Sequence, residues 1–183
     1  MNSQLQATTR ISTQVDSQTN DQPPVTSSIT CRPVGPDDHA FLLEVYGSTR
    51  AEEMALVPWN VDQQQAFVKM QFAGQQEHYQ NTYPTASHEI IQLSGRPVGR
   101  LYVARLEQEI RIVDITLMPA DRNAGIGSFL LRGLLDEAVR VGKIVRIYVE
   151  EFNPSLRLFE RLKFKPAEQH GIHMLLEWSP EPG

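Results

Sequence analysis

The sequence predicts an α/β protein in which about four helices flank one central mixed β-sheet. Three observations lead to this prediction. Two polar stretches with helical spacing precede three consecutive strand-like runs, and a strongly amphipathic helix follows those runs. Strands and helices then alternate to the end of the chain, which is typical of a sheet with helices on its faces.

Composition limits the kinds of partner. The chain has 183 residues, which suits one domain, and a formal net charge of -5 with scattered Lys and Arg, which argues against nucleic acid. No secretory signal and no run of about 18 apolar residues occurs, so we expect no membrane partner. Cys31 is the only cysteine, so neither an intrachain disulfide nor a thiolate metal cluster can form. These features predict a cytoplasmic protein.

The ends of the chain differ from its middle. Residues 1–28 are rich in Gln, Ser and Thr and contain no aromatic residue, so we predict a disordered polar tail. A single domain is expected over residues 29–179, with residues 180–183 as a short C-terminal tail. Residues 29–34 alternate weakly as a first strand, and residues 35–38 begin a helix with an early Pro and two acids.

Two helices are expected before the main strands. Apolar residues recur at helical spacing over residues 39–48, and we interpret residues 50–59 as an irregular continuation. A second, Gln-rich helix is predicted over residues 61–79, with Pro84 as its stop.

The rest of the domain carries the sheet. Three strands separated by turn residues are predicted at residues 88–93, 98–105 and 110–117. A broad apolar stripe predicts a helix over residues 125–141, which Gly142 ends. The last elements are expected to be a strand at residues 144–150, a helix at 154–162 and a strand at 172–178, with an additional strand near 164–166.

The loop before the amphipathic helix carries a chemical signal. Residues 122–127 read Arg-Asn-Ala-Gly-Ile-Gly. Backbone N–H groups at a helix N-terminus lack helical partners, and the helix dipole there favours anions. Gly125 and Gly127 lack the β-carbons that would hold phosphate oxygens away, and Arg122 offers a charge-assisted contact. The loop is therefore predicted to bind a pyrophosphate.

The loop is also compatible with a structural role, and two other phosphate-binding motifs do not fit it. Two nearby glycines also fit a helix start that needs small residues for close packing. A P-loop requires a Gly-Lys-Ser/Thr ending that is missing here, and the dinucleotide fingerprint requires Gly or Ala where Leu130 stands.

Two sequence motifs, the loop at residues 122–127 and a second segment at residues 153–164, resemble the core of the GNAT superfamily of N-acetyltransferases. In that family a strand ending in a hydrophobic residue and Pro leads into Arg/Gln-x-x-Gly-x-Gly/Ala, as Leu117-Met118-Pro119 leads into residues 122–127 here. The second family motif has Asn at a strand end, then a helix with a Tyr, then Gly-Phe, which is similar to residues 153–164. The order of the elements extends the resemblance over residues 29–178.

The resemblance implies an acetyl-CoA-dependent N-acetyltransferase that passes the acetyl group directly to an amine within a ternary complex. It assigns the phosphates to Arg122, Asn123, Ala124, Gly125, Ile126, Gly127 and Ser128. It assigns the pantetheine arm to the backbone of Ile115, Leu117 and Met118. The arm would lie in a gap between the strands at residues 110–117 and 144–150. Family habit also implies a homodimer through sheet edges.

Three positions of the second motif need separate comment. Asn153 fits a cofactor contact and equally a helix N-cap before Pro154. Phe159 stands where family members often place a Tyr that protonates the departing thiolate; it has no hydroxyl and is expected to pack the helix on the sheet. Lys163 replaces the usual Gly before Phe164.

An attacking amine must lose a proton, so a carboxylate base is expected. Asp114 is the first candidate because it lies among apolar strand residues; Glu109, Glu52 and Glu53 are the others. The acceptor region of the family corresponds to Tyr46, Glu53 and Trp59. His170 and His173 lack a third ligand in the sequence, so no metal is expected.

Direct transfer also follows from the nucleophiles. Cys31 is far from both motifs in the sequence, and Ser128 has no triad context. The alternative is a non-catalytic acyl-CoA-binding module in which Phe159 marks lost chemistry.

Overall fold

The computed structural model describes residues 28–180. The predicted polar tail, apart from Ser28, and residues 181–183 lie outside the described part. Within it the chain forms, in order, β1 (Ile29–Pro33), the 3-10 helix η2 (Pro36–Asp38), α1 (His39–Ala55), α2 (Val61–Thr82), β2 (Ser87–Leu93), β3 (Arg96–Arg105), β4 (Glu109–Leu117), the 3-10 helix η3 (Pro119–Asp121), α3 (Ile126–Val141), β5 (Ile144–Glu150), α4 (Leu156–Arg161), β6 (Lys165–His170) and β7 (His173–Trp178).

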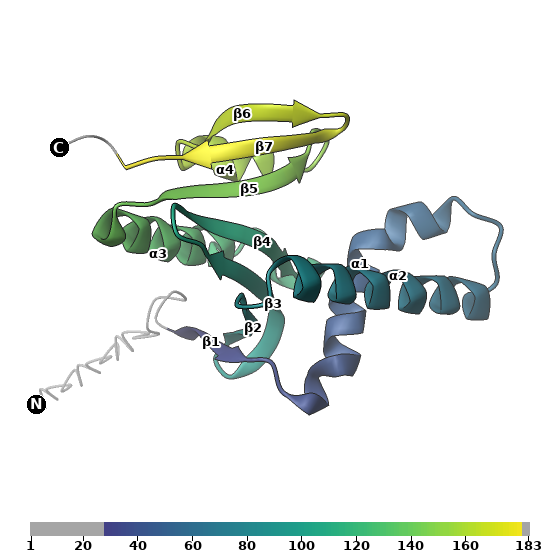
Figure 1. Cartoon of the computed structure of the whole chain (residues 1–183). Helices are drawn as coiled ribbons and strands as arrows, with labels where there is room; N and C mark the ends of the chain where they lie inside the picture. Colours follow the sequence, from purple (N-terminus) through teal and green to yellow (C-terminus); the bar gives the residue numbers. More distant parts are fainter. Residues whose placement is uncertain (1–27, 181–183) are drawn as a thin grey trace, which may run out of the picture.

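All seven described strands join one sheet in the order β1-β2-β3-β4-β5-β7-β6. Every neighbouring pair is antiparallel except β4 and β5, which are parallel. The predicted mixed sheet with four α-helices is confirmed (Figure 1). No described helix combines the length and the apolar content that a bilayer span requires.

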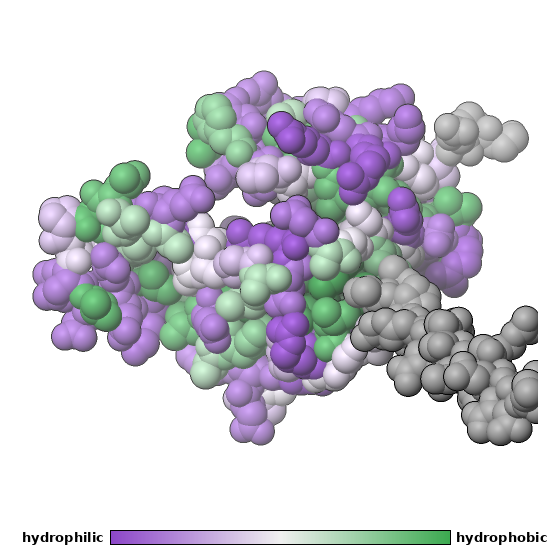
Figure 2. Space-filling view, turned by 180° about the vertical axis from the view of Figure 1, so that it is seen from behind, coloured by the Kyte–Doolittle hydropathy of each residue, from purple (hydrophilic) through white to green (hydrophobic). Residues whose placement is uncertain are grey.

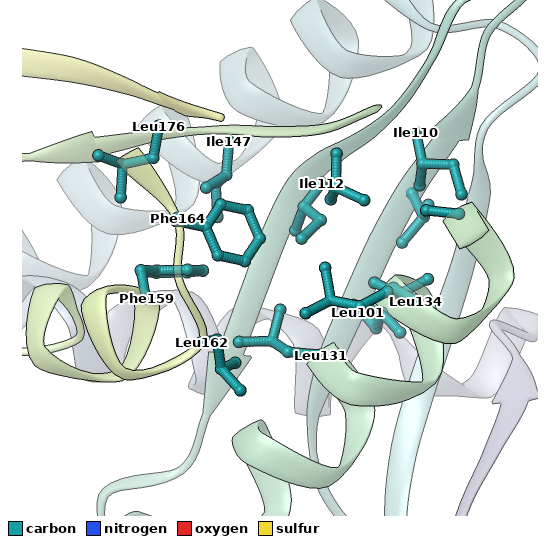
Figure 3. Close-up of a cluster of buried hydrophobic side chains, with 14 of the residues drawn as sticks. Leu101, Ile110, Ile112, Leu131, Leu134, Ile147, Phe159, Leu162, Phe164 and Leu176 are labelled. Atoms are coloured by element: carbon teal, nitrogen blue, oxygen red, sulfur yellow. The ribbon is translucent and has the colours of Figure 1, made fainter. Parts of the chain in front are cut away.

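One face of the sheet packs against α3 and α4 and holds the main apolar core (Figure 3). The stripe predicted for α3 is buried there, and Gly142 ends the helix in a left-handed conformation with φ of 65°. Strand and helix residues from distant parts of the chain meet in this core, including Leu101, Ile110, Ile112, Leu131, Leu134, Ile147, Phe159, Leu162, Phe164 and Leu176. Burial of these side chains stabilises the fold because each removes apolar surface from water.

The opposite face, under α1 and α2, is more polar. A small apolar cluster of Leu42, Tyr46, Phe72 and Ile90 joins the two helices to β2. Beside it the side chain of Arg100 from β3 is 1% exposed and forms an ion pair with Asp114 of β4 at 2.6 Å. A buried charge is costly unless it is paired, so Asp114 compensates for the burial of the Arg100 guanidinium.

Three sequence-based boundaries need correction. Helix α1 continues to Ala55, whereas an irregular stretch was predicted from Arg50. The residues there are good helix formers, and Arg50 forms an i,i+3 ion pair with Glu53 at 2.9 Å. The last helix, α4, begins later than predicted, at Leu156, and the additional strand near residues 164–166 extends over Lys165–His170 as β6.

The strands β3 and β4 approach each other unusually closely at Gly99. This residue pairs with Leu117, and a β-carbon at position 99 would clash with the carbonyl oxygen of Thr116. Backbone atoms cannot move aside as a flexible side chain could, so a side chain at Gly99 would push the end of β4 away from β3.

We therefore expect Gly99→Ala to lower the free energy of unfolding by about 1–3 kcal/mol, measured by urea denaturation. Gly74→Ala is the control, since Gly74 lies inside α2 with open space around its β-position. That change is expected to raise stability by about 0.5–1 kcal/mol. Equal effects of the two substitutions would show that the close approach at Gly99 does not constrain the fold.

Candidate active site

A slot opens where β4 and β5 separate. Their parallel pairing runs from Glu109 with Ile144 to Ile112 with Ile147 and ends there. In β4 the next residue, Val113, is a β-bulge, because Tyr102 pairs with Asp114 and Val103 with Ile112. Strand β5 stays paired with β7 as far as Glu150. The rest of β4 thus has a free edge facing β5, and Figure 2 shows the molecule hollowed between the two halves of the sheet.

The free edge leads directly into the predicted phosphate loop. Asn123 and Gly125 are both left-handed, with φ of 62° and 82°. The first helical hydrogen bond of α3 runs from the N–H of Phe129 to the carbonyl oxygen of Gly125 at 3.0 Å. The N–H groups of Ile126, Gly127 and Ser128 precede that bond, so the helix provides no acceptor for them. Such a turn can bind an anion.

The two glycines of this loop serve different purposes. A β-carbon at Gly127 would lie 3.3 Å from Cδ2 of Leu158 in α4, so the close-packing interpretation applies to Gly127. At Gly125 nothing lies within 4 Å, but the left-handed backbone disfavours other residues. The open space above Gly125 is where an anion has room to approach the loop.

Two arginines lie beside the loop. Nε of Arg122 donates to the carbonyl oxygen of Leu117 at 3.0 Å, so this predicted residue is tied to the end of β4. Nη2 of Arg161 in α4 donates to Oγ of Ser128 at 3.1 Å. Sequence reasoning missed Arg161, because 33 residues separate it from Ser128 and only the packing of α4 beside α3 brings them together.

The residues predicted for the pantetheine arm lie on the free edge. The side chains of Ile115 and Leu117 pack against the main core, which leaves their backbone as the part that can meet a ligand. The N–H of Met118 is already bonded to the carbonyl oxygen of Val98 at 2.8 Å. The unpaired edge before Met118 is therefore the place where an extended, amide-containing chain could add to the sheet.

The second motif is structurally intact. Oδ1 of Asn153 accepts from the N–H of Ser155 at 2.9 Å, so Asn153 caps the turn that begins α4. Phe159 is 1% exposed and its ring meets that of Phe164 edge to face at 5.2 Å (Figure 3). Lys163 is left-handed, with φ of 69°. A Gly adopts this conformation without strain, so Lys163 preserves the turn at some energetic cost.

Asp114 follows the bulged Val113 in the part of β4 that is not paired with β5. Its Oδ1 accepts from the hydroxyl of Thr116 at 2.7 Å. Its Oδ2 accepts from Arg100 at 2.6 Å and from the hydroxyl of Tyr79 in α2 at 3.4 Å. Burial and the adjacent carboxylate raise the pKa of Tyr79, which keeps its phenol protonated. The carboxylate is thus held in one orientation by three neighbours.

The other candidate carboxylates have different surroundings. Glu109 is buried between Arg111 at 2.7 Å and Arg146 at 2.9 Å. Glu53 pairs with Arg50 on the surface of α1, and Glu52 is exposed. Neither of the two α1 carboxylates lies on the strand that borders the slot.

The residues predicted for the acceptor region are spread over the helical hairpin. Tyr46 is buried in the small apolar cluster, where its hydroxyl donates to Gln71 at 3.0 Å. Trp59 lies between α1 and α2, is 38% exposed and contacts the ring of Phe67 at 5.0 Å. The guanidinium of Arg50 lies over the Tyr46 ring at 5.5 Å and pairs with Glu53 at 2.9 Å, so these two predicted residues are joined through Arg50 on α1.

Cys31 and the histidines take no part in this site. Burial raises the pKa of the Cys31 thiol to about 11, so it is not a thiolate at neutral pH. His170 of β6 is exposed beside Glu168, and His173 of β7 is exposed beside Glu150 at the end of β5. Among residues 28–180 no group of three metal-ligating side chains gathers in one place.

Solved structures confirm the fold. PaiA N-acetyltransferase from Thermoplasma acidophilum, in complex with coenzyme A, is 16% identical with a TM-score of 0.62, and the match covers 84% of this chain and 99% of that one. A domain from Methanocaldococcus jannaschii is 18% identical with a TM-score of 0.61, covering 83% and 98%. The Salmonella typhimurium protein yncA, with its cofactor acetyl-CoA, is 20% identical with a TM-score of 0.53, covering 83% and 94%.

Sequence comparison gives the family. No curated protein sequence matches the chain significantly. The model of the acetyltransferase (GNAT) family matches residues 49–164, which is more than half of the chain and includes the slot, the phosphate loop and α4. The chain therefore belongs to the GNAT acetyltransferase family.

Proposed function

We propose that the protein transfers an acetyl group from acetyl-CoA to an amine, directly and within a ternary complex. The observation that carries this proposal is the free edge of β4 leading into the N-terminus of α3. An unpaired strand edge suits the amides of pantetheine, and a helix N-terminus suits a pyrophosphate. One molecule that presents both groups in that order is CoA.

On this proposal the phosphates bind to the N–H groups of Ile126, Gly127 and Ser128, with Arg122 and Arg161 supplying positive charge. The pantetheine arm lies along β4 and brings its thioester toward the bulge at Val113. PaiA and yncA, whose structures hold coenzyme A and acetyl-CoA, support CoA as the ligand of this fold. Asn153 is proposed as a further contact at the end of β5.

The chemical step forms one bond and breaks one. The amine nitrogen attacks the thioester carbon, the carbon–sulfur bond breaks, and the amine loses a proton. We propose Asp114 as the group that receives this proton through water, because it borders the slot and its orientation is fixed by Arg100 and Thr116. The thiolate takes a proton from water, since a thiol of pKa about 8.5 is a tolerable leaving group without a tyrosine at position 159.

Direct transfer is supported by the lack of a suitable nucleophile in the described part of the chain near the slot. Cys31 lies on β1, beyond β2 and β3 from the slot, and is protonated at neutral pH. Ser128 contacts Arg161, which is not a base. An acetyl-enzyme intermediate is therefore not part of the proposal.

The phosphate loop is tested by Gly125→Glu with Gly142→Glu as its matched control. Both glycines are left-handed and lie at opposite ends of α3, so the backbone strain is similar. We expect Gly125→Glu to weaken acetyl-CoA binding by about 100-fold in calorimetry, since a carboxylate would occupy the anion site. Gly142→Glu should leave the dissociation constant unchanged. Loss of binding in both variants would indicate a folding defect, and no binding by the wild type would refute the cosubstrate.

The contribution of Arg161 has its own test. Arg161→Ala is expected to raise the dissociation constant of acetyl-CoA by about 3–10-fold, and the difference should shrink as salt increases, because the contact is exposed. Arg157→Ala changes an exposed arginine on the same helix that makes no hydrogen bond to the loop, so this variant should bind as the wild type does. Equal affinities for all three proteins would remove Arg161 from the site.

Catalysis is tested by release of CoA thiol with a panel of amines. We expect turnover by the wild type, and a loss of about 10²–10⁴-fold in kcat for Asp114→Asn with a changed pH profile and little change in acetyl-CoA affinity. Glu52→Gln, which changes an exposed candidate carboxylate on α1, should retain activity. Thermal melting monitors the folding of Asp114→Asn, which leaves Arg100 without its charged partner. Binding of acetyl-CoA without turnover of any amine would favour the acyl-CoA-binding module instead.

A further inference from the structure

One aromatic residue of β5 stands where β4 and β5 separate. The pairing of the two strands ends with Ile112 and Ile147. If the pairing continued, the next residue of β5, Tyr148, would be the partner of the bulged Val113 of β4. Tyr148 therefore marks the start of the slot on the β5 side.

The side chain of Tyr148 projects from the face of the sheet that also carries Asp114. Ile147 and Val149 belong to the main core under α3 and α4. Side chains alternate along a strand, so Tyr148 between them points from the opposite face. Asp114 lies on that face too, because its carboxylate contacts Tyr79 of α2. Tyr148 on β5 and Asp114 on β4 thus border the start of the slot from the same side of the sheet.

Two neighbours position the ring of Tyr148. The guanidinium of Arg111, a residue of β4, lies over the ring, 5.2 Å from its centre. Arg111 is in turn held by its ion pair with the buried Glu109 at 2.7 Å. On the β6 side, the ring centre of His170 lies 6.4 Å from that of Tyr148. The contact with Arg111 keeps the ring of Tyr148 at the junction of the two strands.

The hydroxyl of Tyr148 is accessible and has no partner in the described protein. Among residues 28–180 it forms no hydrogen bond, and the residue is 47% exposed. The hydroxyl of Tyr79, by comparison, is engaged by Asp114 at 3.4 Å. A phenol can both donate and accept a hydrogen bond, so Tyr148 offers an unused proton donor at the start of the slot.

The proposed acetyl transfer requires a proton at this place. Breaking the carbon–sulfur bond leaves a thiolate, and Phe159, which is 1% exposed in the core, has no hydroxyl to protonate it. In the placement described above, the pantetheine arm brings the thioester toward the bulge at Val113. Tyr148 stands across the slot from this bulge, so its phenol would be the side-chain donor on the β5 side of the sulfur.

We propose that Tyr148 donates a proton to the departing sulfur of CoA, a role that rests on the proposed function. As the amine nitrogen bonds to the thioester carbon and the carbon–sulfur bond breaks, the phenol proton moves to sulfur and CoA leaves as the thiol. The proton lost by the amine passes through water to Asp114. Tyr148 regains a proton from water, and Asp114 returns its proton to water. The positive charge of Arg111 offsets the charge of the transient phenolate.

Two simpler interpretations make a different prediction. Water can protonate a thiolate without any side chain, and the ring of Tyr148 can serve only to cover the sheet and to contact Arg111. Phe at position 148 keeps the ring and loses only the hydroxyl. On either simpler interpretation Tyr148→Phe would leave the rate of acetyl transfer unchanged.

The first test measures single-turnover rates of the full chain with acetyl-CoA and the amine that gives the fastest turnover. Tyr148→Phe should slow transfer by about 10–100-fold, because it removes the general acid. The dissociation constant of acetyl-CoA in calorimetry and the melting temperature should not change, since the exposed hydroxyl forms no bond within the described protein. Tyr83→Phe, which removes a phenol hydroxyl at the end of α2, is the control and should react as the wild type does.

A second acyl donor separates proton donation from a structural role. Acetyl-seleno-CoA carries selenium in place of the thioester sulfur, and a selenol is a stronger acid than a thiol. Its selenolate leaves without help from an acid, so the ratio of the wild-type rate to the Tyr148→Phe rate should fall to about 1–3. A variant that only positions the donor or the amine less well would lose rate equally with both donors.

Equal rates of the wild type and Tyr148→Phe with acetyl-CoA would overturn the proposal, and so would an equal loss with the two donors. In both cases turnover by the wild type leaves the proposed function standing. Binding of acetyl-CoA with no turnover of any amine by the wild type would instead refute the proposed function, and the role of Tyr148 with it.

Discussion

The incomplete pairing of β4 with β5 is the constraint on which the rest of the site depends. Four residue pairs join the two strands, and the bulge at Val113 then turns β4 away while β7 holds β5 as far as Glu150. A free strand edge inside a sheet would normally be a liability, because its N–H and C=O groups need partners. Here the edge ends at the turn before α3, which we propose binds an anion, so that one ligand would satisfy both the edge and the turn.

The local features of this arrangement could be predicted from the sequence. Strand β5 coincides with the predicted residues 144–150, and α3 differs by one residue at its start. Both are signalled by short-range patterns: a continuous apolar run and a broad apolar stripe closed by Gly142. The resemblance to the GNAT family, carried by the loop at residues 122–127 and the motif at 153–164, is confirmed by the family model.

The features of the site that the sequence did not predict depend on contacts between residues far apart in the chain, and a local sequence pattern does not indicate such contacts. Arg161 meets Ser128 because α4 packs beside α3, and Arg100 is buried because α2 covers β3. Arg100 stands in a largely apolar run at residues 98–104, and nothing in this local sequence indicates Gln75 or Asp114 as its partners. The extent of α1 was underestimated for a related reason: its last turn has no apolar stripe and is stabilised by helix formers and the Arg50–Glu53 pair.

The two faces of the sheet have different roles: one holds the apolar core, and the other holds the charged side chains of the candidate site. The face under α3 and α4 is an apolar core, whose burial favours folding in proportion to area and needs no exact partner for each atom. The face under α2 buries the Arg100–Asp114 pair, and a well-packed apolar pair at such a place would often be at least as stable. The charged pair therefore contributes little that the fold requires. What it does provide is a carboxylate held in one orientation on the part of β4 that is not paired with β5.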